Sequence, residues 1–214
     1  MSSHWDFLLL ADQLRDVVAG AEADLQLERA VYGLDARSEV EIQGVLAAGL
    51  ASTYEVAREV HYPSSAGKKL SHRQRCDLVL TPKGRPLKLD RAPATLFDAP
   101  DQAEPGEGLW LEVKVAYQFQ EGGRRHAGYG AAWRTKVVED LKKMEAEPLI
   151  KEAGLCLVVF TESQAILDKD IELFEDVLAR KEVLAGFRKV RSVPIWERNG
   201  HRVCTVAVWP TVQR

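Results

Sequence analysis

The chain has 214 residues, of which 46% are hydrophobic and 29% charged, so it can bury a proper core and is predicted to form one domain over residues 1–214. Its formal net charge of −3 argues against strong non-specific binding to a polyanion. The amino terminus has no basic region followed by a long apolar run, because FLLLA is too short for a signal-peptide core or a membrane span. We therefore expect a soluble, cytoplasmic protein with no membrane partner.

Two helices are predicted at the start of the chain. Apolar residues recur at three- or four-residue steps through residues 4–30, which predicts an amphipathic helix. Ser38 is then followed three residues later by Glu41, a capping-box pattern that predicts the start of a second helix. From Tyr54 the period changes to two, which predicts a strand that ends before Pro63.

The middle of the chain predicts two more strands and a long connection between them. Residues 76–81 (CDLVLT) and 109–119 (LWLEVKVAYQF) have the composition of strands. The intervening residues 83–108 are rich in Pro, Asp and Glu, so we expect a surface loop or an insertion there.

The second half continues with a basic, glycine-rich loop and a helix over 131–146. A buried strand is predicted over 155–161 and a further amphipathic helix over 167–187. The dipeptide Asn199-Gly200 stands between two β-rich runs, which predicts a carboxyl-terminal hairpin.

This order of elements predicts an α/β fold. The three early strands are expected to form a meander, after which the helix at 131–146 crosses over to the strand at 155–161 in the right-handed sense. The result is a mixed β-sheet flanked by helices. The three cysteines lie in the predicted strands without a CxxC pair and are expected to be buried, reduced thiols: Cys76, Cys156 and Cys204.

Three charged residues stand in otherwise apolar strands. In LWLEVKV the alternation places Glu112 and Lys114 on one face, about 6–7 Å apart along the strand. Asp77 is the only charged residue in CDLVLT. If these strands are neighbours, the three ionisable groups converge.

Such a cluster suits phosphodiester hydrolysis. Two carboxylates supply the hard oxygen ligands that Mg²⁺ prefers, and Mn²⁺ is expected to substitute. A bound metal lowers the pKa of a water molecule, and an ammonium group can stabilise the charge of the transition state. The alternative is an edge strand with a solvent-facing side, on which Glu112 and Lys114 form an ordinary surface pair.

With Asp77 followed by Glu112-Val113-Lys114, the sequence resembles the PD-(D/E)XK (restriction-endonuclease-like) nucleases. The resemblance covers about residues 38–161, and leaves the helix at 4–30 and the helix plus hairpin at 167–210 as additions. Two features depart from the family pattern: Cys76 stands where the proline of the name would be, and Glu112 follows Asp77 by 35 residues.

The resemblance implies roles for individual residues. Asp77 and Glu112 become metal ligands, with the Val113 carbonyl as a further possible ligand, and Lys114 becomes the catalytic lysine. An acidic residue on the helix before the first core strand often joins the site in this family. Here it is Glu39 or Glu41, and we prefer Glu39 because Glu41 already has a duty in the capping box.

Basic segments flank the predicted site. Residues 67–75 carry four lysines and arginines and no acid. Each basic cluster alone is more simply a solvated loop, but their positions suggest contacts to a phosphate backbone. The candidate nucleic-acid-binding residues are Lys68, Lys69, Arg73, Arg75, Arg124, Arg125 and Lys136.

The sequence therefore predicts a magnesium-dependent nuclease that acts on nucleic acid, with DNA as the preferred partner. Its substrate could be duplex, branched or single-stranded, and a homodimer is left open. A non-catalytic binding or scaffold protein on the same fold is the first alternative. A metal-dependent hydrolase of another phosphoester is the second.

Overall fold

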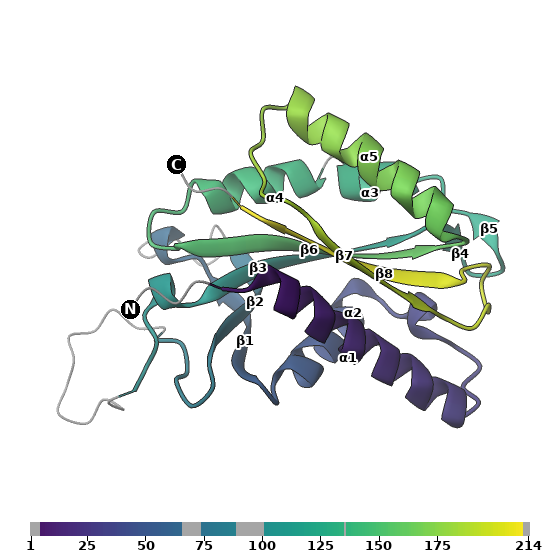
Figure 1. The fold of residues 1–214 in the computed structure, drawn as a ribbon, viewed down its shortest axis with the longest axis horizontal. Coiled ribbons are helices and arrows are strands. Elements are labelled where there is room, and N and C mark those ends of the chain that lie inside the picture. The colour runs from purple at the N-terminus through teal and green to yellow at the C-terminus, as the bar shows by residue number, and fades with distance from the viewer. Residues whose placement is uncertain (1–4, 66–73, 89–100, 135, 212–214) are drawn as a thin grey trace.

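The protein folds around one mixed β-sheet covered by helices on both faces, as a computed structural model shows (Figure 1). The structure describes residues 5–65, 74–88, 101–134 and 136–211. Its helices are α1 (Phe7–Leu27), α2 (Glu39–Leu50), α3 (Tyr129–Arg134), α4 (Lys136–Glu145) and α5 (Gln164–Arg180). Its strands are β1 (Tyr54–His61), β2 (Arg75–Pro82), β3 (Leu109–Tyr117), β4 (Phe119–Gln120), β5 (Arg124–Arg125), β6 (Glu152–Thr161), β7 (Lys189–Pro194) and β8 (Val203–Pro210).

The strand order confirms the predicted meander and places the strand after the crossover helices beside β3. The main sheet runs β1-β2-β3-β6-β8-β7, with β1, β2 and β3 as an antiparallel meander. Strand β6 lies parallel to β3, as expected for strands joined by a crossover through α3 and α4. All other pairs in this sheet are antiparallel. The predicted α/β class and mixed sheet are therefore confirmed.

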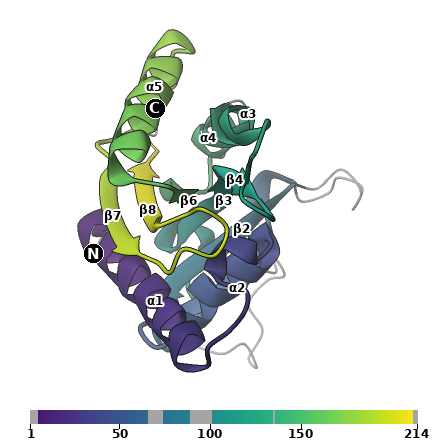
Figure 2. The ribbon, with the colours of Figure 1, turned by 90° about the vertical axis from the view of Figure 1, so that its right-hand side faces the viewer.

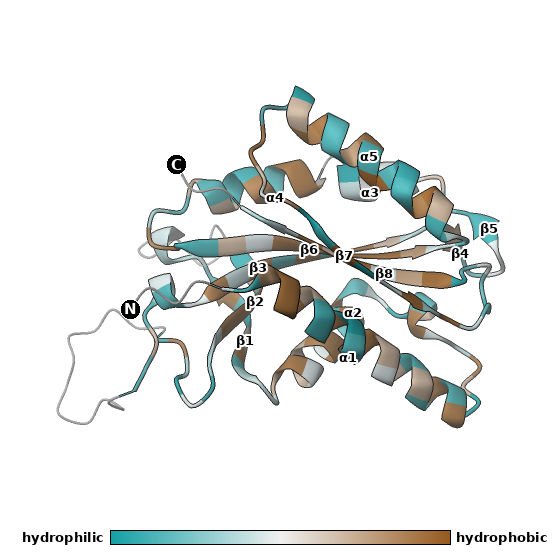
Figure 3. Cartoon of the chain, viewed as in Figure 1, coloured by the Kyte–Doolittle hydropathy of each residue, from teal (hydrophilic) through white to brown (hydrophobic). Residues whose placement is uncertain are grey.

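The sheet separates two hydrophobic cores. Figure 2 shows α1 and α2 on one side of the sheet and α3, α4 and α5 on the other. Along β3, Leu111 and Val113 belong to the core under α1 and α2, whereas Trp110 and Ala116 belong to the core under α4 and α5. In Figure 3 hydrophobic and hydrophilic stretches alternate along α5, as expected for a helix with one buried face.

The start of α2 follows the predicted capping box. The Ser38 side chain accepts a hydrogen bond from the Glu41 backbone N–H, and Glu41 Oε2 accepts one from the Ser38 N–H at 2.7 Å. Ile42, Leu46 and Leu50 then face the core. This fixed start determines which side chains of the first helical turn point toward the sheet.

Some predicted boundaries were wrong. Helical residues of α3 and α4 cover the helix predicted over 131–146, on either side of residue 135, which lies outside the described residues. The helix predicted over 167–187 begins earlier, where Ser163 caps α5, and ends at Arg180. The strand predicted over 109–119 ends at Tyr117. Phe119–Gln120 instead pairs with Arg124–Arg125 as a small separate ribbon.

The carboxyl-terminal hairpin exists, but Asn199-Gly200 does not form a two-residue turn in it. Strand β7 ends at Pro194, which has no backbone N–H to continue a ladder. Residues 195–202 form a longer loop, in which Gly200 has φ +92°. A side chain there would be strained, and its Cβ would lie 3.1 Å from the Phe119 ring.

The three cysteines are free and buried, as predicted. Among the described helices, none is both long and apolar enough to cross a membrane.

Candidate active site

The β2–β3 ladder stops early, and a carboxylate takes its place. The last paired residues are Leu78 and Leu111. Beyond them Asp77 Oδ2 accepts a hydrogen bond from the Val113 N–H at 2.7 Å. A buried backbone N–H needs a partner, so this side chain replaces the missing strand neighbour.

A local distortion of β1 and β2 accompanies this change. Ala57 and Val60 pack against the same core although they are three residues apart, and so do Cys76 and Val79. Regular alternation would put such pairs on opposite faces. In β1, between Ala57 and Val60, Glu59 adopts φ +52°, an uncommon conformation for a non-glycine residue. Asp77 thus lies at an interruption of regular strand geometry.

The second carboxylate on the open edge of β3 comes from α2. Glu39, in the first turn of the helix, accepts a hydrogen bond from the Val115 N–H at 3.2 Å through Oε2. Glu41 instead completes the capping box with Ser38 and is exposed. The structure therefore brings Glu39, and not Glu41, to Asp77 and the Glu112-Val113-Lys114 segment.

Lys114 stands at the centre of the cluster. Its Nζ lies 3.6 Å from Glu39 Oε1, 3.7 Å from Asp77 Oδ2 and 3.9 Å from Glu112 Oε2. It also contacts the Val113 carbonyl oxygen at 3.3 Å. Glu112 is only 2% exposed and the Lys114 side chain is largely buried, so the alternative of an ordinary solvent-facing surface pair is wrong.

Three residues of the cluster were missed from the sequence. Asp140 Oδ2, on α4, lies 3.7 Å from Lys114 Nζ. Lys143 Nζ lies 2.5 Å from Glu112 Oε1 and 3.2 Å from Asp140 Oδ1. The Tyr62 hydroxyl donates a hydrogen bond to Glu112 Oε1 at 2.6 Å. A signal existed for Asp140, because it falls on the stripe of Val137 and Met144 that faces the sheet.

Burial and crowding change the acidities of the carboxyl groups. Burial, reinforced by the charge of Asp77, raises the pKa of Glu112 to about 7 despite its contacts with Lys143 and Tyr62. Burial also raises the pKa of Asp77, against the opposing effects of Lys114 and the Val113 N–H. These carboxyl groups hold protons at a higher pH than isolated ones.

The pKa values of the two lysines are also raised, but by the neighbouring carboxylates and against the effect of burial. Burial alone would lower the pKa of Lys114, but the surrounding carboxylates, Asp77 first, raise it above its ordinary value. The pKa of Lys143 is likewise raised, because Glu112 and Asp140 together outweigh the effect of burial. Both ammonium groups therefore stay charged at neutral pH.

The raised pKa of Glu112 predicts an unusual effect on stability. This carboxyl binds a proton more tightly in the folded than in the unfolded chain, so stability present below pH 4.5 is lost as the pH rises through about 7. Without divalent metal, Glu112→Gln should stabilise the protein at pH 8 by on the order of 3 kcal/mol, or about 5–10 °C in Tm, and much less at pH 5.

Thermal unfolding from pH 5 to pH 8 checks this expectation. Glu197→Gln serves as the control, because Glu197 makes an exposed pair with Arg202. Its pH profile should run parallel to that of the wild type. An equal effect of Glu112→Gln at both pH values would show that ionisation of Glu112 does not destabilise the folded protein.

The predicted phosphate contacts are only partly within the described residues. Lys68, Lys69 and Arg73 lie outside them, as does the side chain of Lys136. Arg75 is exposed, with Glu59 at 3.9 Å, and Arg124 and Arg125 are exposed on β5. The described arginines are thus accessible, but none of them belongs to the carboxylate cluster.

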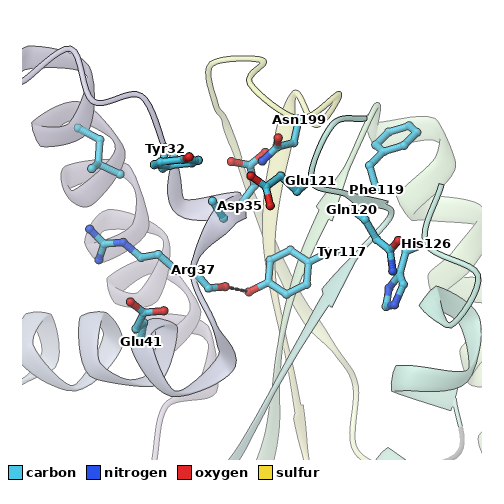
Figure 4. Close-up of a pocket in the computed structure, with 13 residues that line it drawn as sticks. Tyr32, Asp35, Arg37, Glu41, Tyr117, Phe119, Gln120, Glu121, His126 and Asn199 are labelled. Atoms are coloured by element: carbon cyan, nitrogen blue, oxygen red, sulfur yellow. Dashed lines mark hydrogen bonds between the residues drawn. The ribbon is translucent and has the colours of Figure 1, made fainter. Parts of the chain in front are cut away.

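A pocket of about 870 Å³ lies beside Tyr117 at the end of β3 (Figure 4). Its walls come from the α1–α2 connection, the end of β3, the β4–β5 ribbon and the β7–β8 loop. Tyr117 donates a hydrogen bond to the Arg37 carbonyl across one side of it (Figure 4). The lining residues are Leu25, Tyr32, Gly33, Asp35, Ala36, Arg37, Glu41, Tyr117, Phe119, Gln120, Glu121, His126 and Asn199.

A buried histidine holds the parts of this pocket together. His201 Nε2 accepts a hydrogen bond from the Phe119 N–H at 3.0 Å, so the ring proton is left for Nδ1. Nδ1 lies 2.8 Å from Asp35 Oδ2. The contact links the β7–β8 loop to β4 and to the α1–α2 connection.

The cluster's oxygen atoms fit a hard divalent cation. Carboxylates and a backbone carbonyl are the ligands that Mg²⁺ prefers, and the cluster has two more carboxyl than ammonium groups: Glu39, Asp77, Glu112 and Asp140 against Lys114 and Lys143. No three acidic, histidine or cysteine side chains of the described segments already form a metal-binding group. The Lys114 ammonium competes with a cation for the same oxygens.

No protein-family model, no curated protein and no solved structure matches this chain. The function is therefore inferred from the chemistry of the cluster.

Proposed function

We propose that the protein is a divalent-metal-dependent nuclease with a restriction-endonuclease-like core. It hydrolyses phosphodiester bonds in nucleic acid, and DNA is the preferred candidate substrate. One observation carries the proposal. Carboxylates from α2 and β2 replace the strand partner of β3 and meet Glu112 around the Lys114 ammonium. The order of α2, the β1–β3 meander, the crossover helices and parallel β6 supports the core assignment.

The chain's own residues supply positioning and charge. Asp77 and Glu112 are the proposed ligands of Mg²⁺ or Mn²⁺, together with the Val113 carbonyl. When bound, the ion lowers the pKa of water and offsets charge on the phosphate. Lys114 donates hydrogen bonds to the attacking water or to a phosphate oxygen as negative charge develops there. Hydrolysis forms a bond from water oxygen to phosphorus and breaks the bond to the leaving oxygen, which gains a proton.

Residues behind the proposed ligands hold them in place. Lys143 and Tyr62 both contact Glu112 Oε1, which restricts the rotation of that carboxylate. Asp140 contacts both lysines, so it keeps Lys143 beside Glu112 and Lys114 beside the open edge of β3. Partners of this kind orient metal ligands and typically change metal affinity or activity by about 10- to 100-fold.

The second candidate is a scaffold that keeps this arrangement without catalysis. It is favoured by the ion pairs themselves, because Lys114 and Lys143 already neutralise part of the charge of the cluster. A calorimetric titration with Mn²⁺ separates the two candidates. A nuclease should bind Mn²⁺ and lose that binding in Asp77→Ala. A wild-type protein that binds no Mn²⁺ favours the scaffold and overturns the nuclease.

The helical acid can be tested with two matched variants of one helix turn. Glu39→Gln keeps an acceptor for the Val115 N–H but removes the charge beside Lys114, so cleavage should fall about 10- to 100-fold. Glu41→Gln can still close the capping box, so cleavage and thermal stability should remain near wild type. Cleavage rates under single turnover measure both. A larger loss in Glu41→Gln would reject Glu39 as part of the site.

A further inference from the structure

The pocket is lined by residues that are close in the chain to the proposed active site, although no residue of the cluster itself lines it. Lys114 and Tyr117 belong to the same strand, about 10 Å apart along it by the rise of a β-strand. On the opposite wall Arg37 lies two residues before Glu39. The two segments that carry the cluster therefore run on into the pocket walls, and the Tyr117–Arg37 hydrogen bond joins them there.

The lining combines aromatic rings with amides. Tyr32 is 63% exposed at the pocket, whereas Tyr117 is held by stacking on Phe160, with ring centroids 5.1 Å apart. Gln120 and Asn199 add side-chain amides, each of which can both donate and accept hydrogen bonds (Figure 4). Aromatic faces stack on nucleobases, and amides match the hydrogen-bonding edges of bases.

The charge of the lining decides which part of a nucleotide fits. Two exposed carboxyl-bearing residues, Glu41 and Glu121, line the pocket against the single guanidinium of Arg37, and a third, Asp35, is buried behind the lining against His201. A phosphate group would be repelled by this surface, whereas an uncharged base would not. The volume, about 870 Å³, lies within the range of ordinary ligand pockets and accommodates one base.

We propose that this pocket receives one unpaired nucleobase next to the scissile phosphate, so that the substrate is single-stranded or locally unpaired. A base within a duplex must leave the stack before it can enter such a pocket. This inference rests on the proposed function for the position of the phosphate. The recognition of the base rests on the pocket alone.

Binding of a free nucleoside tests the pocket without any cleavage. Saturation-transfer NMR with 2′-deoxyadenosine should show transfer to the base protons, and 2-deoxyribose alone should show none. The double variant Tyr32→Ala/Gln120→Ala should weaken binding about tenfold, as expected for loss of a stacking partner. Phe187→Ala removes a 91% exposed ring outside the pocket lining and should leave binding unchanged. No transfer in the wild type, or equal binding by the double variant, overturns the pocket.

Cleavage of matched substrates tests the same inference in the working enzyme. One labelled sequence is supplied single-stranded, as a blunt duplex and as a duplex with one unpaired nucleotide. The wild type should cleave the first and third at least about tenfold faster than the blunt duplex, because extrusion of a paired base costs energy. Equal rates on all three overturn the inference and leave the nuclease intact. If the protein binds the nucleoside but cleaves none of the substrates, the nuclease proposal is rejected and the base-binding pocket is still supported.

Discussion

Replacement of Asp77 by asparagine is expected to abolish metal-dependent cleavage while the fold is retained. Asparagine has nearly the same shape, and its side-chain oxygen can still accept the hydrogen bond from the Val113 N–H. What disappears is the negative charge, and with it a ligand that a hard cation requires. The variant should therefore lose metal binding while it keeps the hydrogen bond to the Val113 N–H.

The measurement pairs single-turnover cleavage with thermal unfolding of the same preparation. Glu55→Gln is the matched control, because Glu55 lies on neighbouring β1 and pairs with Lys83 outside the cluster. It should cleave like the wild type. Normal cleavage by Asp77→Asn would remove this carboxylate from the site.

Replacement of Lys114 by methionine is expected to separate catalysis from metal binding. A charged lysine has no lone pair and cannot be a ligand, so its proposed role is confined to the attacking water and the transition state. Loss of a positioned electrostatic group should reduce turnover by about 10²–10³-fold. Mn²⁺ affinity should hold or rise, because a cation that competes for Asp77 and Glu39 has been removed.

Calorimetry and cleavage rates on one preparation check both halves of this expectation. Lys83→Met provides a control with the same chemical change. Lys83 forms an ion pair with Glu55, and neither residue belongs to the cluster. If Lys114→Met cleaves like the wild type, the Glu112-Val113-Lys114 pattern has no catalytic meaning. If it loses Mn²⁺ binding as well, the lysine instead holds the carboxylates in place.

Local rules predicted much of the fold because they depend on neighbouring residues. Ser38 and Glu41 fixed the start of α2. The capping role of Glu41, together with the position of Glu39 three residues before Ile42, favoured Glu39 as the acid that faces the sheet. The alternation in β3 placed Glu112 and Lys114 on one face, where α4 now covers them. Caps and strand alternation are determined within a few residues, so a single sequence carries them.

The features that were missed depend on distant contacts. The early end of the β2–β3 ladder arises where Asp77 replaces a strand partner and Glu59 takes a positive φ, neither of which a strand pattern reveals. Lys143 reaches Glu112 only because α4 packs against the sheet over neighbouring β6. The long β7–β8 loop was also missed because it depends on distant contacts: His201 in this loop contacts Asp35 and Phe119.

Incubation of the purified protein with linear, circular and single-stranded DNA tests the central claim most directly. Each reaction is run with Mn²⁺ or Mg²⁺ and again with excess chelator, with Asp77→Asn alongside. We expect cleavage of at least one substrate that requires the metal, stops with chelator, resumes when metal is restored in excess, and is absent in the variant. Intact DNA under every condition, or equal cleavage by Asp77→Asn, would contradict the assignment of this cluster as a nuclease site.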